Sequence, residues 1–149
     1  MFGDYWYSIK DGNDRGRYLY LRHYSARHYK DNRLRRLFVG PGEKLVLMTT
    51  DGMALFVWRK FRSMDNQSGV NCSIFRNEGP YLSSDLIKDA CKIAWQKWPG
   101  ERLYTYINKG KVKSPNPGYC FKLAGWEYIN DNQNGKLAIL EIKTGEIDQ

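Results

Sequence analysis

One stretch of this chain, residues 69–126, constrains the fold more than any other, because strand and helix signals alternate along it in a fixed order. The signals predict, in sequence, a strand at 70–75, a turn at 76–80, a helix at about 83–98, a strand at 103–107 and a short helix at 118–126. A turn between a strand and a helix presents backbone N–H groups at the helix N-terminus, and such groups attract anions. The sequence therefore predicts an anion-binding turn that begins at Arg76 and runs into the helix.

The long helix is predicted from apolar residues that recur at helical spacing on one face. These are Leu86, Ile87, Ala90, Ile93, Ala94 and Trp98. Ser83 or Ser84 can cap the N-terminus of this helix, and Pro99-Gly100 ends it.

The rest of the chain predicts more strand than helix. Asp51-Gly52 separates two apolar runs and is a strong signal for a hairpin turn. Strands are predicted at 17–21, 44–50, 53–59 and 136–142, and residues 24–36 predict a short helix followed by a loop. Together these elements predict one α+β domain over residues 1–149, with a mostly antiparallel central sheet flanked by helices.

The composition favours a globular protein without a membrane span. Of the 149 residues, 42% are apolar and 15% are aromatic, and no apolar run approaches the roughly 18 residues of a membrane helix. The N-terminal sequence lacks the basic start and apolar run of a secretory signal. Cys72, Cys91 and Cys120 have no metal-binding spacing, so we expect three small buried side chains and a cytoplasmic protein.

The positive charge is concentrated in the N-terminal part. The net charge of +8 comes from 24 basic and 16 acidic residues. Residues 1–63 hold 13 of the basic and 6 of the acidic residues (+7), which leaves 11 and 10 (+1) for residues 64–149. Basic residues are interleaved with aromatic ones over residues 22–36, and this pattern favours contact with nucleic acid, because cations neutralise phosphates and aromatic rings stack on unpaired bases. The alternative is a solvated basic segment; the candidate contacts are Arg22, Arg27, Arg33, Arg35 and Arg36.

The order of elements over residues 70–140 and the closing Phe121-x-x-x-Gly125-Trp126 resemble the GNAT N-acetyltransferase superfamily. Arg76 and Gly79 match two positions of its pyrophosphate signature, whereas Tyr81 stands where that family has a small residue. The resemblance implies a GNAT-like fold and an acyl donor, acetyl-CoA or a related compound. The donor would be held by Cys72, Ile74, Arg76, Asn77, Gly79, Ser83 and Ser84.

Arg22-His23-Tyr24-Ser25 resembles a short motif of Mom proteins, GNAT-like phage enzymes that modify adenine in DNA. A later arginine, a serine on the following helix and the Gly118-to-Phe121 block stand in a comparable order, while Asn108 replaces an acidic residue of that family. Blocks that begin at Gly40, Phe75 and Asn116 also resemble small phage proteins. The resemblance implies transfer to an amine of a DNA base that meets His23, Tyr24 and Ser25, in the cytoplasm of a host cell.

His23 and Tyr119 are the candidates for proton transfer. An imidazole titrates near neutral pH and serves as a base or a metal ligand, although a structural hydrogen-bonded histidine is the alternative. His28 lacks the further partners that a metal site with His23 would need, so no metal is predicted. A phenol held close to a leaving group can protonate it, which is the role implied for Tyr119 or Tyr106. The tryptophans at 58, 95, 98 and 126 are predicted core residues.

Two other functions fit the same sequence. The first is an acetyl-CoA-dependent N-acetyltransferase that acts on a small-molecule or protein amine. The second is a GNAT-like binding protein without catalysis. The sequence leaves these alternatives and the oligomeric state open.

Overall fold

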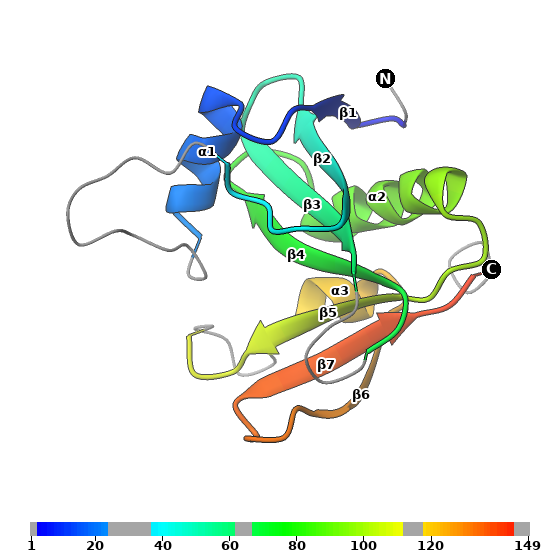
Figure 1. Ribbon diagram of the computed structural model, residues 1–149. Coiled ribbons are helices and arrows are strands. Elements are labelled where there is room, and N and C mark those ends of the chain that lie inside the picture. Colours follow the sequence, from blue (N-terminus) through cyan, green and yellow to red (C-terminus); the bar gives the residue numbers. More distant parts are fainter. Residues whose placement is uncertain (1–2, 24–36, 62–66, 112–117, 145–149) are drawn as a thin grey trace.

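The computed structural model describes residues 3–23, 37–61, 67–111 and 118–144. Within these residues the chain has an α+β fold with a seven-stranded mixed sheet and three helices (Figure 1). In chain order the elements are β1 (Trp6–Ile9), α1 (Asp14–Leu21), β2 (Glu43–Thr49), β3 (Ala54–Lys60), β4 (Val70–Asn77), α2 (Ser83–Lys97), β5 (Leu103–Asn108), α3 (Tyr119–Leu123), β6 (Glu127–Asp131) and β7 (Leu137–Ile142).

The sheet divides at its middle. The strand order is β1-β2-β3-β4-β5-β7-β6, and every neighbouring pair is antiparallel except β4 and β5. β4 and β5 are parallel because α2 connects them as a crossover. Their pairing ends after three residues, at Cys72↔Thr105. Beyond this pair the two strands diverge, as the green and yellow arrows show in Figure 1.

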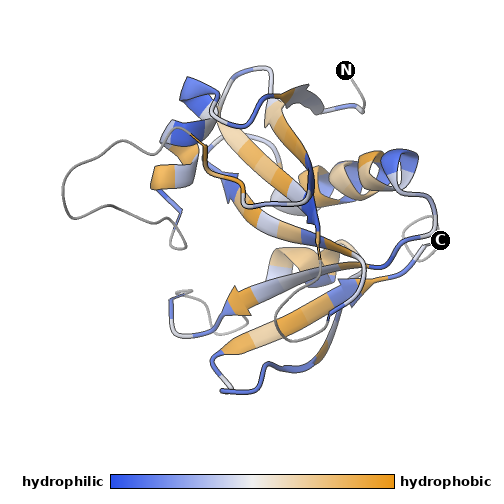
Figure 2. Cartoon of the chain, in the orientation of Figure 1, coloured by the Kyte–Doolittle hydropathy of each residue, from blue (hydrophilic) through white to orange (hydrophobic). Residues whose placement is uncertain are grey.

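Helices cover both faces of the sheet. Phe56 and Trp58 of β3 pack in the buried cluster that contains the apolar residues of α2 and α3. Leu55 and Val57, which point to the opposite face, pack in a second cluster with Leu19 of α1. Apolar residues therefore follow the central strands, and hydrophilic residues lie toward the helix ends and turns (Figure 2).

The predicted long helix is confirmed as α2. Its apolar face is buried against the sheet, where the indole N–H of Trp6 donates to Leu86 O at 2.8 Å and that of Trp58 donates to Ala90 O at 3.0 Å. The predicted serine cap is wrong. Leu82 occupies the N-cap position without a side-chain hydrogen bond, and Ser83 Oγ instead accepts from Asn77 Nδ2 at 3.0 Å.

The strand predicted at residues 17–21 is wrong, because this segment belongs to α1. Asn13 Oδ1 accepts from Gly16 N at 3.0 Å and caps the helix, and Asp14 lies in its first turn. Leu19 and Tyr20 are both buried although they are adjacent, which a strand with one covered face does not allow. The sequence Tyr-Leu-Tyr-Leu has high strand propensity, and packing against the sheet overrides it.

The strands predicted at 44–50, 53–59, 70–75, 103–107 and 136–142 are confirmed within two residues at either end as β2, β3, β4, β5 and β7. The hairpin turn at Asp51-Gly52 is confirmed in place, with four residues rather than two between β2 and β3. Edge strands β1 and β6 were not predicted, because β1 has four residues and the residues of β6 are mostly exposed without alternation. The helix and loop predicted at 24–36 lie outside the described residues.

The predicted core residues largely lie inside. Trp58, Trp98 and Trp126 are buried, and Trp95 is partly buried against the same cluster. The short helix predicted at 118–126 is confirmed in place as α3, but it ends at Leu123. Trp126 folds back beyond it, with its backbone N–H donating to Phe121 O at 3.0 Å.

Candidate functional site

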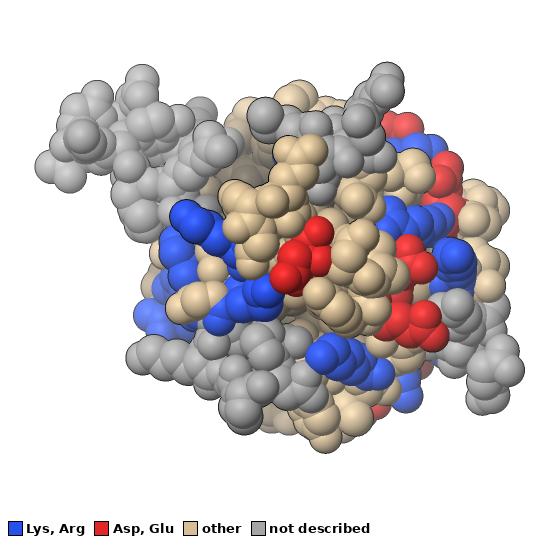
Figure 3. All heavy atoms as spheres, turned by 90° about the horizontal axis from the view of Figure 1, so that it is seen from below, with Lys and Arg blue, Asp and Glu red and all other residues tan. Residues whose placement is uncertain are grey.

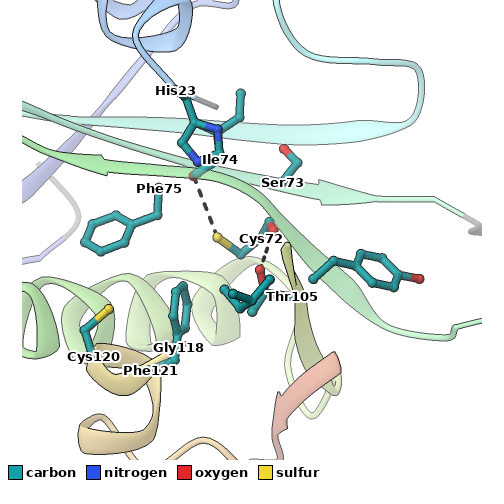
Figure 4. A pocket seen from close by; sticks show the side chains of 11 residues that line it. His23, Cys72, Ser73, Ile74, Phe75, Thr105, Gly118, Cys120 and Phe121 are labelled. Atoms are coloured by element: carbon teal, nitrogen blue, oxygen red, sulfur yellow. Dashed lines mark hydrogen bonds between the residues drawn. The ribbon is translucent and has the colours of Figure 1, made fainter. Parts of the chain in front are cut away.

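A cavity of about 170 Å³ lies where β4 and β5 separate (Figure 4). A core cavity of roughly 150 Å³ can hold a benzene molecule, so this one has room for a group of that size. Its wall is formed by residues 72–75 of β4, residues 105–107 of β5, His23 after α1, and Gly118, Cys120 and Phe121 at α3.

A β-bulge in β4 accounts for the separation of the strands. Val57 and Trp58 are adjacent in β3, but they pair with Ile74 and Cys72, so Ser73 is an extra residue in β4. A bulge bends its strand and increases the local twist. Since Ser73 directly follows the last residue of β4 that pairs with β5, the bend directs the rest of β4 away from β5.

The cavity extends from one face of the sheet to the other. The bulge also reverses the alternation in β4: Cys72 packs with the cluster of α2 and α3, whereas Ile74 packs with the cluster of α1. In Figure 4, His23 lies on one side of β4, and Cys120 and Phe121 of α3 lie on the other. A ligand in this cavity would contact residues from both layers of helices.

The lining has no side chain of Asp, Glu, Lys or Arg among the described residues. Two of its polar groups are bonded internally: Thr105 Oγ1 donates to Cys72 O at 2.9 Å, and Cys72 Sγ donates to Ile74 O at 3.7 Å. Ser73 Oγ is buried and has no hydrogen-bond partner within the described part of the chain. Because no charged side chain lines it, the cavity suits an uncharged group.

His23 is uncharged at neutral pH. Burial, and then the nearby positive charge of Arg76, lower its pKa from 6.5 to about 4. The side chain is half-buried and borders the cavity. An imidazole in this state can accept a proton or a hydrogen bond, and a protonated one would release its proton readily.

The three cysteines are free thiols that stay protonated. Burial raises the pKa of Cys72 well above its usual value, that of Cys91 to about 12, and that of Cys120 above its usual value as well. A nucleophilic cysteine needs a lowered pKa, so these thiols act as packing groups. The prediction that all three are buried is confirmed for Cys72 and Cys91 and is wrong for Cys120, which is only partly buried.

The predicted anion-binding turn is occupied by an acidic side chain of the chain itself. The Nε atoms of Arg22 and Arg76 donate to Glu78 Oε2 at 2.7 Å and 2.8 Å. Arg76 Nη1 also donates to the carbonyl oxygen of Arg22 at 2.9 Å. These hydrogen bonds from Arg76 and Arg22 hold the pKa of Glu78 below its usual value. The network joins the end of α1 to the end of β4 and fixes the residue that precedes His23.

The backbone of this turn is also engaged. Glu78 N donates to Met53 O at 2.8 Å, and Gly79 N donates to Asn77 Oδ1 at 3.0 Å. The N–H groups of Ser83 and Ser84 at the start of α2 have no acceptor within the described residues. A diphosphate therefore does not fit the turn as it stands, because Glu78 occupies both arginines and two of the turn's N–H groups are bonded internally.

The structure brings together some of the predicted site residues. His23, Cys72 and Ile74 line the cavity, whereas Arg76, Asn77, Gly79, Ser83 and Ser84 form or adjoin the turn. Tyr119 is 54% exposed and is not part of the cavity wall, which includes Tyr106 instead. Tyr24, Ser25, Arg27, Arg33, Arg35 and Arg36 lie outside the described residues.

Arg22 is the described member of the predicted DNA-contacting set. Its guanidinium lies 5.6 Å from the ring centre of Tyr18, and that of Arg15 lies 4.6 Å from the same ring. Tyr18 is 46% exposed, so this side of α1 presents an aromatic ring between two cations. Figure 3 shows one group of basic residues at one side of the face viewed from below, and further basic residues mixed with acidic ones across the rest of that face.

Several residues of the cavity were not singled out by the sequence. Thr105 and Ile107 lie within a predicted strand, and Ser73 lies in a continuous run that shows no bulge signal. Residue pairing across β3, β4 and β5 places them at the cavity, and a single sequence does not reveal that pairing.

No group of three or more His, Cys, Asp or Glu side chains that could hold a metal ion occurs within the described ranges. The helices found there are all too short or too polar to cross a membrane.

The chain was compared with protein-family models, with curated proteins and with solved structures, and none of the three comparisons gave a match. The cavity, the bulge and the arginine–glutamate network therefore carry the functional argument.

Proposed function

We propose that this protein is a GNAT-like group transferase that modifies an amine of a nucleobase in DNA. The observation that carries the proposal is the cavity between β4 and β5, which has an uncharged imidazole at its wall and no charged lining residue among those described. Such a cavity suits a neutral, planar nucleobase as its ligand. The uncharged imidazole at its wall can accept a proton from that ligand.

The arrangement of strands supports the GNAT-like part of the proposal. A crossover helix joins two parallel strands that pair over three residues and then separate at a bulge. The free edge of β4 beyond Cys72 faces the cavity, and an extended donor chain can pair with such an edge.

The charge distribution supports DNA as the acceptor. The segment that follows α1 begins at Arg22 and His23 and carries most of the excess positive charge of the chain. Since His23 lines the cavity, this segment starts at the site and can position a polynucleotide beside it.

His23 would act on the acceptor amine. As the amine nitrogen bonds to the transferred acyl group, the bond between that group and its donor breaks. The proton lost by the nitrogen passes to the imidazole and then to water. The low pKa makes the imidazole a weak proton acceptor that releases the proton readily to water at the mouth of the cavity.

The donor is proposed as an activated acyl compound. Acetyl-CoA would require the diphosphate to displace Glu78 from Arg22 and Arg76, so we derive no step from acetyl-CoA itself. The same occupied turn favours the second candidate function, a GNAT-like protein that binds a ligand without catalysis.

The proposal is tested by nucleoside mass spectrometry of DNA from a bacterial host that expresses the protein. A new nucleoside mass is expected with the unchanged chain. It should disappear with His23→Ala and persist with His28→Ala, which changes the other histidine of the chain. The mass difference would identify the transferred group.

Unchanged host DNA in the presence of folded protein would contradict the proposal. Tight acetyl-CoA binding in that case would favour the small-molecule or protein acetyltransferase, and binding of neither donor nor DNA would favour the non-catalytic protein.

A further inference from the structure

An exposed aromatic ring lies between two guanidinium groups on one face of α1. Arg15 and Tyr18 of the helix and Arg22 at its C-cap are spaced three and four residues apart, which places their side chains on the same face. The guanidinium carbons of Arg15 and Arg22 lie 4.6 Å and 5.6 Å from the centre of the Tyr18 ring. We call these three residues the Tyr18 surface.

Neither guanidinium is centred on the ring of Tyr18. In the closer contact of Arg59 with Phe61, the guanidinium carbon lies 3.6 Å from the ring centre. The longer distances at Tyr18 agree with its exposure of 46%, and the side chain of Arg22 is 48% exposed. The Tyr18 surface is therefore accessible to a ligand.

Internal hydrogen bonds hold both guanidiniums beside the ring. Arg15 Nε donates to Gly52 O at 2.6 Å, and Arg22 Nε donates to Glu78 Oε2 at 2.7 Å. Each of these bonds uses one of the five N–H donors of a guanidinium, so it fixes the charge in place without consuming the group. Glu78 is shared with Arg76, so the Tyr18 surface keeps a net positive charge.

The Tyr18 surface also adjoins the cavity. Asp14, the acidic residue of α1, lies 3.9 Å from the guanidinium of Arg17 and is paired with it. Tyr18 lies about 6 Å along the helix axis from Arg22, and the next residue, His23, lines the cavity. A base next to one that occupies the cavity is therefore close enough to reach the ring.

We infer that the Tyr18 surface binds single-stranded DNA beside the acceptor base, with an unpaired base stacked on Tyr18 and phosphates bound by Arg15 and Arg22. This inference rests on the proposed function. The positive charge favours a polyanion, and the exposed ring favours a strand with unpaired bases over a duplex, whose bases stack on one another. A base that enters the cavity leaves its neighbours, and a neighbour that stacks on Tyr18 offsets part of that cost.

The test compares two single-stranded thymidine oligonucleotides of equal length, one intact and one in which every nucleotide is abasic. Their phosphates are the same, so a difference in affinity reports the bases. By fluorescence anisotropy, Tyr18→Leu should weaken binding of the intact strand about fivefold or more and that of the abasic strand less than about twofold. Tyr18→Phe keeps the ring and should bind both strands as the unchanged protein does.

Arg15→Gln tests the phosphate contacts separately. It should weaken binding of both strands alike, and the loss of one phosphate contact should reduce the slope of log affinity against log salt concentration by about 0.7. Tyr128→Leu is the matched control, because Tyr128 is 51% exposed on β6 at the far edge of the sheet, and it should change neither affinity. Thermal unfolding checks that each variant is folded, as expected for exposed positions.

Equal affinity of Tyr18→Leu and the unchanged protein for the intact strand would overturn the inference. Equal weakening on both strands, or absence of binding by the unchanged protein, would overturn it as well. Host DNA modification is measured separately. A new nucleoside mass without a role for Tyr18 in binding would leave the proposed function in place, and stacking on Tyr18 without a new nucleoside would contradict the proposed function alone.

Discussion

His23 shows how a single environment sets the charge of a candidate catalytic group. Its pKa is lowered to about 4, first by burial and then by Arg76, whereas in the unfolded chain it returns to about 6.5. Between these values the unfolded chain binds a proton that the folded chain does not. The contribution of His23 to stability is therefore complete above about pH 6.5 and is lost as the pH falls toward 4.

We predict that His23→Gln makes stability less sensitive to acid between pH 6.5 and 4. The difference between the unchanged protein and the variant should grow to on the order of 2 kcal/mol across this range. Urea unfolding at half-unit pH steps measures it, with His28→Gln as the control. Parallel curves for the unchanged protein and His23→Gln would contradict the assignment. Carboxylates such as Glu78 add a loss at lower pH that is common to both proteins.

Glu78 is predicted to position His23 through Arg22. Both arginine Nε atoms meet one oxygen of its carboxylate, and Arg22 directly precedes His23. Glu78→Gln should shift the ring resonances of His23 in NMR spectra and leave those of His28 in place. Glu101→Gln, which removes a partner of Lys60 at 2.8 Å, is the matched control and should change neither. An unaltered His23 spectrum in Glu78→Gln would rule out the positioning role.

At the scale of elements, α1 connects the N-terminal part of the chain to the site. The helix has eight residues, and Asn13 caps it through Gly16 N. Isolated helices of this length are marginal in water, so the cap and the packing of Leu19 and Tyr20 decide whether α1 forms.

We predict that Asn13→Ala destabilises the protein by about 1 kcal/mol, the usual cost of a lost N-cap. Asn13→Asp keeps an acceptor for Gly16 N and should stay within about 0.5 kcal/mol of the unchanged protein. Chemical unfolding of the three proteins provides the comparison. Equal losses in both variants would show that the cap contributes nothing. Because His23 follows α1, Asn13→Ala should also broaden the His23 resonances.

The helices and strands that the sequence predicts correctly are those with a buried apolar face. α2 and strands β2, β3, β4, β5 and β7 have apolar patterns that the sheet buries, and the sequence predicts them. β1 and β6 are edge strands, and pairing along one edge stabilises them more than their own residue pattern does. α1 was mistaken for a strand because its aromatic and leucine residues favour strands locally, while its cap and tertiary packing favour a helix.

At the scale of the whole molecule, electrostatics should govern encounter with DNA. The net charge is +8, of which +7 belongs to residues 1–63. If four phosphates are neutralised, affinity for single-stranded DNA should fall about fiftyfold between roughly 50 and 200 mM salt.

Replacing Arg22, Arg27, Arg33, Arg35 and Arg36 with Gln should reduce this salt dependence. A control with the same loss of charge at exposed lysines, namely Lys88, Lys92, Lys97, Lys136 and Lys143, should keep it. Fluorescence anisotropy titrations at several salt concentrations measure both. Equal slopes of log affinity against log salt concentration for the two variants would show that net charge, and not the segment after α1, attracts the DNA. Absence of binding at low salt would contradict the DNA proposal.

The sequence by itself determined the α+β class, most of the sheet strands, the long helix and the identity of the core, because hydrophobic periodicity is local information. Three of the candidate site residues that it predicted, His23, Cys72 and Ile74, line the cavity. Only the tertiary structure decided that β4 bulges at Ser73, that β5 diverges there, and that Glu78 occupies the arginines of the turn. These features depend on strand register and on contacts between residues more than fifty positions apart, such as Arg22 and Glu78, and no local pattern encodes such contacts.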